Sequence, residues 1–244
     1  MGFVNMNTIK KLLLLVLAAP AVAMASSGVH LDKAPYDLND KASLQRGAKT
    51  FVNYCLNCHS ASYMRYNRLK DIGLTDDQIK ENLLFAAEKV GEPMDVAMSK
   101  KDAKVFFGAT PPDLTVIARS RGADWLYTYL RGFYRDDTRP TGWNNTVFDK
   151  VGMPHVLYGM QGEQVMHVEK QGEHETSHLV MAKAGTMTTP EYDAATADLV
   201  NYLVYMGEPA QQTRMRLGVI VLLFLGIFFV VAYYLKKEFW KDIH

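Results

Sequence analysis

Two apolar stretches frame the chain, and their lengths predict different roles. Leu12–Ala19 follows Lys10 and Lys11 and is too short to cross a bilayer, whereas Leu217–Leu235 runs for 19 residues without a charge. At about 1.5 Å per residue, the second stretch crosses most of a hydrocarbon core of about 30 Å. It therefore predicts a membrane helix, while the first predicts a signal peptide.

The residues that flank these stretches predict how the chain is oriented. Ala21–Ala23 and Ala23–Ala25 both fit an A-x-A cleavage pattern, and we favour cleavage after Ala25. The three lysines that follow the second stretch mark the short tail as cytoplasmic, so the domain between the stretches lies on the other side of the membrane. The alternative, a buried core helix, fits poorly because charged residues bracket both ends of Leu217–Leu235.

Between the two stretches, the apolar spacing is mostly helical. It predicts helices over 42–55, 79–87, 123–130 and 189–206, the first capped by Asp40 and the second opened by a capping box at Thr75–Gln78. Residues 89–110 and 135–150 are rich in turn formers and predict loops, and there is little strand signal. The sequence thus divides into a signal peptide (1–25), one exported domain (26–208) and an anchor with a short tail (209–244).

Charge is distributed unevenly along the chain. Residues 26–213 hold 20 Lys and Arg against 24 Asp and Glu, a net charge of −4, although the whole chain is close to neutral. An acidic exported domain does not indicate nucleic-acid binding. It favours a basic partner that is steered by long-range charge.

The feature with the clearest chemistry is the run Cys55-Leu56-Asn57-Cys58-His59. A C-x-x-C-H motif is typical of covalent c-type haem attachment, with the two cysteines as thioether ligands to the ring and the histidine beneath the iron. A zinc site would normally need a second cysteine pair, and a thioredoxin-like site would need a β-α-β frame. Cys55 and Cys58 are the only cysteines, and no such frame is predicted.

A haem that transfers electrons needs a second axial ligand, and a methionine there raises the potential. Of the 13 methionines, some belong to the terminal segments, Met64 is too close to His59, and Met206 is expected on the core face of a helix. The remaining candidates are Met94, Met98, Met153, Met160, Met166, Met181 and Met187. Met153 is favoured because Gly152 and Pro154 build a close, stiff loop around it. Met187 comes next, and His155 is a rival on the same loop.

Several further segments carry a family resemblance together with the haem motif. They are Gln45-Arg46-Gly47, Met64–Leu69, Pro111-Pro112-Asp113-Leu114, Arg121–Leu130, Gly152-Met153-Pro154, and the tail from Asp198 through Glu208-Pro209 to the anchor. In this order the chain resembles the bacterial members of the cytochrome c1 family, the haem subunits of cytochrome bc1 complexes. It departs from the animal pattern in having a short segment between His59 and Pro111 without an extra cysteine pair.

The resemblance implies a site and a fold. One haem c would be bound covalently through Cys55 and Cys58, with His59 and Met153 as axial ligands to the iron. The implied fold is mostly α, a class I-like mono-haem cytochrome c domain with long loops and one C-terminal transmembrane helix. The other residues implied at the haem are Pro112 and Leu114 at its edge, Arg121 paired with a propionate, and Trp125 beside it.

It also implies a function and partners. The chain would pass electrons from the Rieske iron–sulfur protein to a cytochrome c, as a subunit of a quinol–cytochrome c oxidoreductase with cytochrome b, in a homodimeric complex surrounded by membrane lipid. The haem domain would face the periplasm from the bacterial inner membrane. The alternatives are another membrane-anchored c-type cytochrome, such as an oxidase subunit or an electron shuttle, and a gas-binding haem module with an open iron site.

An acidic stretch remains outside these motifs. Glu163, Glu169, Glu173 and Glu175 cluster with only Lys170 between them, and Asp136-Asp137 forms a second acidic pair. We expect either a docking face for a basic cytochrome c or an ordinary solvated loop. Three histidines in the same stretch, His167, His174 and His178, would also suit a metal ion.

Overall fold

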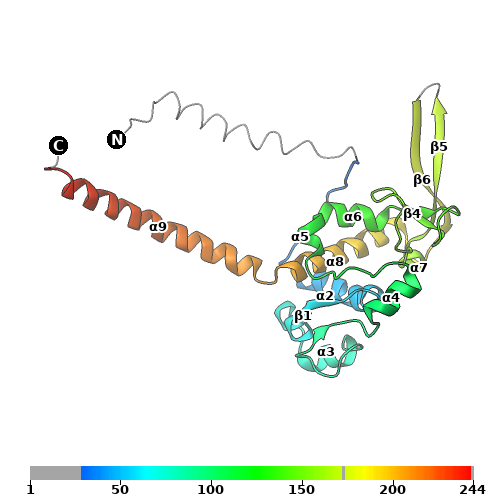
Figure 1. Cartoon of the computed structure of the whole chain (residues 1–244), viewed down its shortest axis with the longest axis horizontal. Helices are drawn as coiled ribbons and strands as arrows, with labels where there is room; N and C mark the ends of the chain where they lie inside the picture. The colour runs from blue at the N-terminus through cyan, green and yellow to red at the C-terminus, as the bar shows by residue number, and fades with distance from the viewer. Residues whose placement is uncertain (1–28, 172–173, 243–244) are drawn as a thin grey trace. The chain divides into compact units, whose positions relative to one another are not determined.

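A computed structural model describes residues 29–171 and 174–242 of the chain (Figure 1). The predicted signal peptide lies outside the described residues. The description therefore begins just inside the domain predicted at 26–208.

The centre of the domain is a pair of packed helices, α2 (Lys41–Thr50) and α8 (Thr189–Gly207). Gly47 lies directly on α8, where a Cβ atom would collide with the carbonyl oxygen of Asp198. The neighbouring Arg46 forms two hydrogen bonds with the Asp198 carboxylate, at 2.6 and 2.9 Å. Glycine therefore permits the close approach, and the ion pair beside it fixes the register of the two helices.

The predicted helix starts are confirmed by their caps. The Asp40 carboxylate accepts from the Ser43 amide at 3.0 Å at the start of α2. Thr75 and Gln78 form the expected capping box before α3 (Asp76–Asn82), which ends five residues earlier than predicted. Thr188 forms a second capping box at the start of α8. Each cap satisfies backbone amides that the first helical turn leaves without partners.

The haem motif lies at the end of a helix that changes its winding. After Thr50, α2 continues as a π-helical turn, η1 (Phe51–Cys55), instead of the regular α-helix that was predicted through Cys55. Phe51 is fully buried in this turn and packs against Tyr202 of α8, with ring centroids 5.6 Å apart. The wider turn thus belongs to the core and places Cys55 at its edge, where the residue is still buried.

Two more helices cover α8 from another side. They are α5 (Ile117–Arg121) and α6 (Ala123–Arg131), and α6 matches the helix predicted at 123–130. Leu126, Tyr127, Tyr129 and Leu130 of α6 are buried.

Short elements connect the rest of the domain. They are η2 (Tyr66–Ile72), α4 (Lys100–Phe107) and α7 (Tyr158–Gln161). Helix α4 lies inside the segment predicted as loop, so that prediction was wrong there.

The strands were largely missed. β1 (Ala61–Arg65) pairs with β2 (Pro93–Met94), and a four-stranded sheet has the order β4-β3-β5-β6. Its members are β3 (Phe133–Arg135), β4 (Trp143–Asn145), β5 (Gly162–Gln171) and β6 (His174–Ala184). The acidic stretch read as a loop is therefore a long antiparallel hairpin, which Figure 1 shows extending from the domain. Valines on both of its faces are exposed, so the alternation that signals a strand is absent.

The C-terminal helix α9 (Gln211–Phe239) contains the whole predicted span 217–235. Within the described residues it alone is long and apolar enough to cross a membrane, and none of its residues is buried. With this helix and the helical core, the fold agrees with the predicted mostly α architecture and single C-terminal anchor.

Candidate haem site

The two cysteines of the motif lie on one tight turn that follows η1. The amides of Cys58 and His59 both donate to the carbonyl oxygen of Cys55, at 3.1 and 2.9 Å. Cys55 is buried, Cys58 is half-buried, and both carry free thiols. The turn therefore presents two unpaired sulfur atoms next to the histidine, as covalent haem attachment requires.

The electrostatics of Cys55 argue against the other uses of such a pair. Burial, and secondarily the nearby Cys58, raises the pKa of the Cys55 thiol to about 12. Zinc ligands and redox-active cysteines act as thiolates, and reactive cysteines have a lowered pKa. In the described ranges no three His, Cys, Asp or Glu side chains are grouped to hold a metal ion. A neutral, buried thiol is suited to a stable thioether.

His59 is oriented as an iron ligand would be. Its Nδ1 lies 2.8 Å from the carbonyl oxygen of Pro112. Because a carbonyl only accepts, Nδ1 must carry the proton, which leaves the lone pair on Nε2 free for a metal. Burial lowers the pKa of His59, and this outweighs the opposing effects of the Pro112 carbonyl and Asp113. The ring is therefore neutral near neutral pH, as a ligand must be.

The loop that holds His59 is itself organised by Asp113, which the sequence analysis did not single out. Its carboxylate accepts from the Ser62 amide at 2.8 Å and from the amide and hydroxyl of Thr115 at 2.8 and 2.6 Å. Burial raises its pKa, but these hydrogen bonds outweigh burial and hold the pKa below its usual value. The Leu114 amide also donates to the Ser60 carbonyl at 2.8 Å. Pro112 and Leu114 are thus fixed beside the haem motif.

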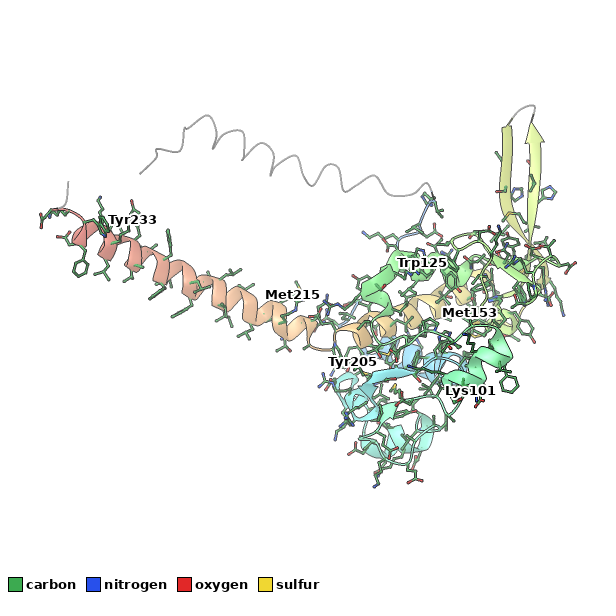
Figure 2. All side chains as sticks on the ribbon, in the orientation of Figure 1. Lys101, Trp125, Met153, Tyr205, Met215 and Tyr233 are labelled. Carbon is green, nitrogen blue, oxygen red and sulfur yellow. The ribbon has the colours of Figure 1, made fainter. Side chains whose placement is uncertain are left out.

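The other predicted residues form a second connected group along α6. The Arg121 guanidinium lies 5.2 Å from the Trp125 ring centroid, and Trp125 stacks on Tyr129 at 4.7 Å and 12°. The Tyr129 hydroxyl lies 3.4 Å from the Met153 sulfur. Figure 2 labels Trp125 on α6 and Met153 in the loop that precedes α7. Tyr129 therefore connects the predicted Arg121–Trp125 pair with Met153, and sequence reasoning missed it.

His155, the rival ligand, occupies a different environment from Met153. Its ring is 2% exposed, stacks on Phe133 at 4.8 Å and meets Trp143 edge-on at 5.0 Å. Burial lowers its pKa to about 4, with Gln161 opposing and Arg135 adding to this effect. Its Nε2 has no hydrogen-bond partner among the described residues. These contacts are those of a neutral histidine in an aromatic core.

Helix α8 connects the two groups, because it packs against both α2 and α6. The His59 group follows α2 and η1, whereas the Met153 group depends on α6. Among the other candidate methionines, Met94 is fully buried with its sulfur 3.5 Å from the Tyr202 hydroxyl, and Met181 lies 40% exposed on the hairpin. Met187 is half-buried against the core.

Two of the acidic residues have partners within the domain. Glu163, at the base of the hairpin, pairs with Arg135 at 2.9 Å and with Lys183 at 3.6 Å, and the Arg135 hydrogen bond chiefly lowers its pKa. Asp136 accepts from Thr138 and Asn144. Glu169 is exposed on β5, while the Glu173 and Glu175 side chains lie outside the described residues. Glu163 and Asp136 therefore have local structural roles.

Two of the three histidines that were considered for a metal ion face each other across the hairpin. His167 and His178 are register partners with ring centroids 5.3 Å apart, and the His167 Nε2 lies 3.9 Å from a Glu169 carboxylate oxygen. In the described part of the chain, these side chains do not belong to a group of three that could hold a metal ion. His174 has no described side chain.

A family model and several known proteins resemble this chain over most of its length. The Cytochrome C1 family model matches residues 32–243. Cytochrome c1 of Allochromatium vinosum is 50% identical over 94% of this chain and 96% of its own length, and mitochondrial cytochrome c1 of Neurospora crassa is 28% identical over 91% and 70%. A Nitrosomonas europaea protein named ammonia monooxygenase gamma subunit is 56% identical over 98% of this chain and all of its own length.

One of these names differs from the others, but the family match extends over the haem motif, both groups of site residues and the anchor. The two cytochrome c1 relatives also align with most of the chain. On this evidence the chain belongs to the cytochrome c1 family, whose members are the haem subunits of cytochrome bc1 complexes.

Proposed function

We propose that this chain carries electrons through one haem c held covalently by Cys55 and Cys58, with His59 and Met153 as the axial ligands. When bound, the haem supplies a centre that takes up and gives off one electron at a time. The observation that carries the proposal is the His59–Pro112 hydrogen bond, which fixes the tautomer that leaves Nε2 free to bind iron.

The residues around the site have separate tasks in this proposal. Met153 supplies a neutral sulfur that favours reduced iron and so a positive potential. Arg121 is exposed and forms no ion pair with a described residue, so its guanidinium is available to a haem propionate. Trp125 holds that guanidinium through its ring face. Pro112 and Leu114 border the haem next to His59.

The proposed partners follow from the family. The Rieske iron–sulfur protein reduces the haem, a cytochrome c oxidises it, and the anchor packs beside cytochrome b in a homodimeric complex within the lipid. The domain at 26–208 faces the periplasm, because a cleaved signal at 1–25 would export it and the lysines after residue 235 would hold the tail in the cytoplasm. The chain is the electron carrier, and the complex is the quinol–cytochrome c oxidoreductase.

An anaerobic redox titration of the purified membrane complex tests the ligand assignment. We expect a low-spin c-type spectrum, a weak near-infrared band from sulfur bound to ferric iron, and a positive potential. A high-spin spectrum that changes with carbon monoxide would instead favour the gas-binding alternative. A normal haem spectrum in a chain that purifies without cytochrome b would favour another membrane-anchored cytochrome.

A further inference from the structure

Tyr129 is a buried tyrosine whose hydroxyl meets the sulfur of Met153. The oxygen–sulfur distance is 3.4 Å, and Tyr129 is 9% exposed. Because the ordinary pKa of a tyrosine is about 10, the hydroxyl keeps its proton throughout the physiological range. Met153 has no proton to give, so the hydroxyl must be the donor and the thioether the acceptor.

The position of this hydroxyl is fixed by the packing of its ring and backbone. Trp125 stacks on one face of the Tyr129 ring, and Phe133 meets it edge-on at 5.1 Å and 68°. The Asn145 side chain donates to the Tyr129 carbonyl at 2.8 Å, which ties this turn of α6 to β4. The phenol is therefore held by contacts within the protein itself.

We propose that Tyr129 is a positioning residue that holds the Met153 sulfur and raises the haem potential through this hydrogen bond. The inference rests on the proposed function, in which Met153 binds the iron. A thioether sulfur has two lone pairs, so one can bind iron while the other accepts the hydroxyl. The hydrogen bond draws electron density from the sulfur and weakens its donation to ferric iron more than to ferrous iron. Its loss favours the oxidised state.

The same helix offers a matched control. Tyr127 is also buried, at 7% exposed, but its ring lies under the Arg131 guanidinium at 4.4 Å and its environment includes Asp193 and Asp32. Tyr127→Phe thus removes a phenol from α6 without touching Met153. Comparing it with Tyr129→Phe separates the hydrogen bond from general effects on the helix.

The experiment is a redox titration of three complexes, the wild type, Tyr129→Phe and Tyr127→Phe, with the near-infrared sulfur–iron band recorded for each. In Tyr129→Phe, we expect the ratio of reduced to oxidised haem at a fixed potential to fall about threefold, or roughly 28 mV for a one-electron couple. The band should shift or weaken while the haem content stays normal. Tyr127→Phe should match the wild type.

Each outcome has a distinct meaning. If Tyr129→Phe retains its haem but loses the near-infrared band, the positioning role is supported more strongly than by a shifted or weakened band. An unchanged potential and band in Tyr129→Phe overturns the inference and leaves Tyr129 as a packing residue, with the proposed function intact. Absence of the band in the wild type overturns the assignment of Met153, and the inference falls with it.

Discussion

The two proposed axial ligands are held in different ways. His59 is fixed by its neighbours in sequence and by a backbone carbonyl, since it lies on the turn of Cys55 and binds Pro112. Met153 is held by side chains, through Tyr129 and the aromatic stack on α6. A backbone partner survives most substitutions, whereas a side-chain contact can be changed one residue at a time. If both residues bind the iron as proposed, the potential would be adjusted on the Met153 side and haem binding would be secured on the His59 side.

Removing His59 should give the largest effect. We expect His59→Ala to abolish a stable low-spin haem in the membrane, because no other side chain on the turn can replace the imidazole. Haem staining and a reduced pyridine haemochrome spectrum measure this. Asn57→Ala is the control, since the exposed Asn57 bonds only to the Asn53 carbonyl, and it should keep normal haem. A normal spectrum in His59→Ala would remove His59 from the site.

Removing the Met153 sulfur should leave the haem attached but change the haem potential. We expect Met153→Leu to keep covalent haem, lose the near-infrared band and lower the potential by on the order of 0.1–0.3 V, within the range of about 0.8 V that axial ligands span. Redox titration measures this. Met187→Leu, at the second candidate position, should leave the potential unchanged, and the opposite pattern would exchange the two assignments.

A substitution in the loop that orients His59 should have a smaller effect than loss of either proposed ligand. Asp113→Asn removes charge from a carboxylate that accepts three hydrogen bonds, so we expect the thermal midpoint to fall by about 2–4 °C. Because the folded pKa is lowered, the charged form stabilises the fold above the unfolded pKa of about 3.9 and is lost as pH falls through the lower folded value. The difference between the wild type and the variant should therefore be constant from pH 5 to 8. A difference that grows with pH in this range would contradict the assignment.

The exposed hairpin should give the smallest effect. We expect Glu169→Lys to slow reduction of a basic cytochrome c by no more than about threefold at low salt, with the difference lost at high salt. Stopped-flow kinetics at two ionic strengths measure it. Glu81→Lys, on the exposed side of α3, is the charge-matched control. Equal rates for the two variants would mean that the hairpin has no docking role.

The same contrast explains what could be predicted from the sequence. Some features depend only on residues that are close together in the sequence, so they could be predicted from it. They are the Cys55–His59 motif, the caps at Asp40 and Thr75, and the apolar span. Met153 was favoured from its loop but chosen through a resemblance. Its contact with Tyr129 joins residues 24 positions apart on different elements, and no local pattern encodes such a distance.

The missed strands have a different cause. In β5 and β6, the apolar residues do not alternate strictly with polar ones and valines on both faces are exposed, so the period that reports burial is absent. Helix α4 was missed because Val105, Phe106 and Phe107 are all exposed and give no core-facing stripe. In both cases the secondary structure depends on strand pairing or helix capping, and neither of these produces a hydrophobic period in the sequence.

The junction before α9 has a consequence for how electrons reach this protein. Only three residues, Glu208 to Ala210, separate α8 from α9, and Arg214 of α9 pairs with Glu208 across them. At no more than about 3.6 Å per residue, so short a link gives the domain a reach of about 10 Å. A cytochrome tethered so closely cannot act as a long-range shuttle. In the proposed function its donor and acceptor would have to travel instead, and the rate of turnover would depend on how quickly those partners find a haem that stays in place.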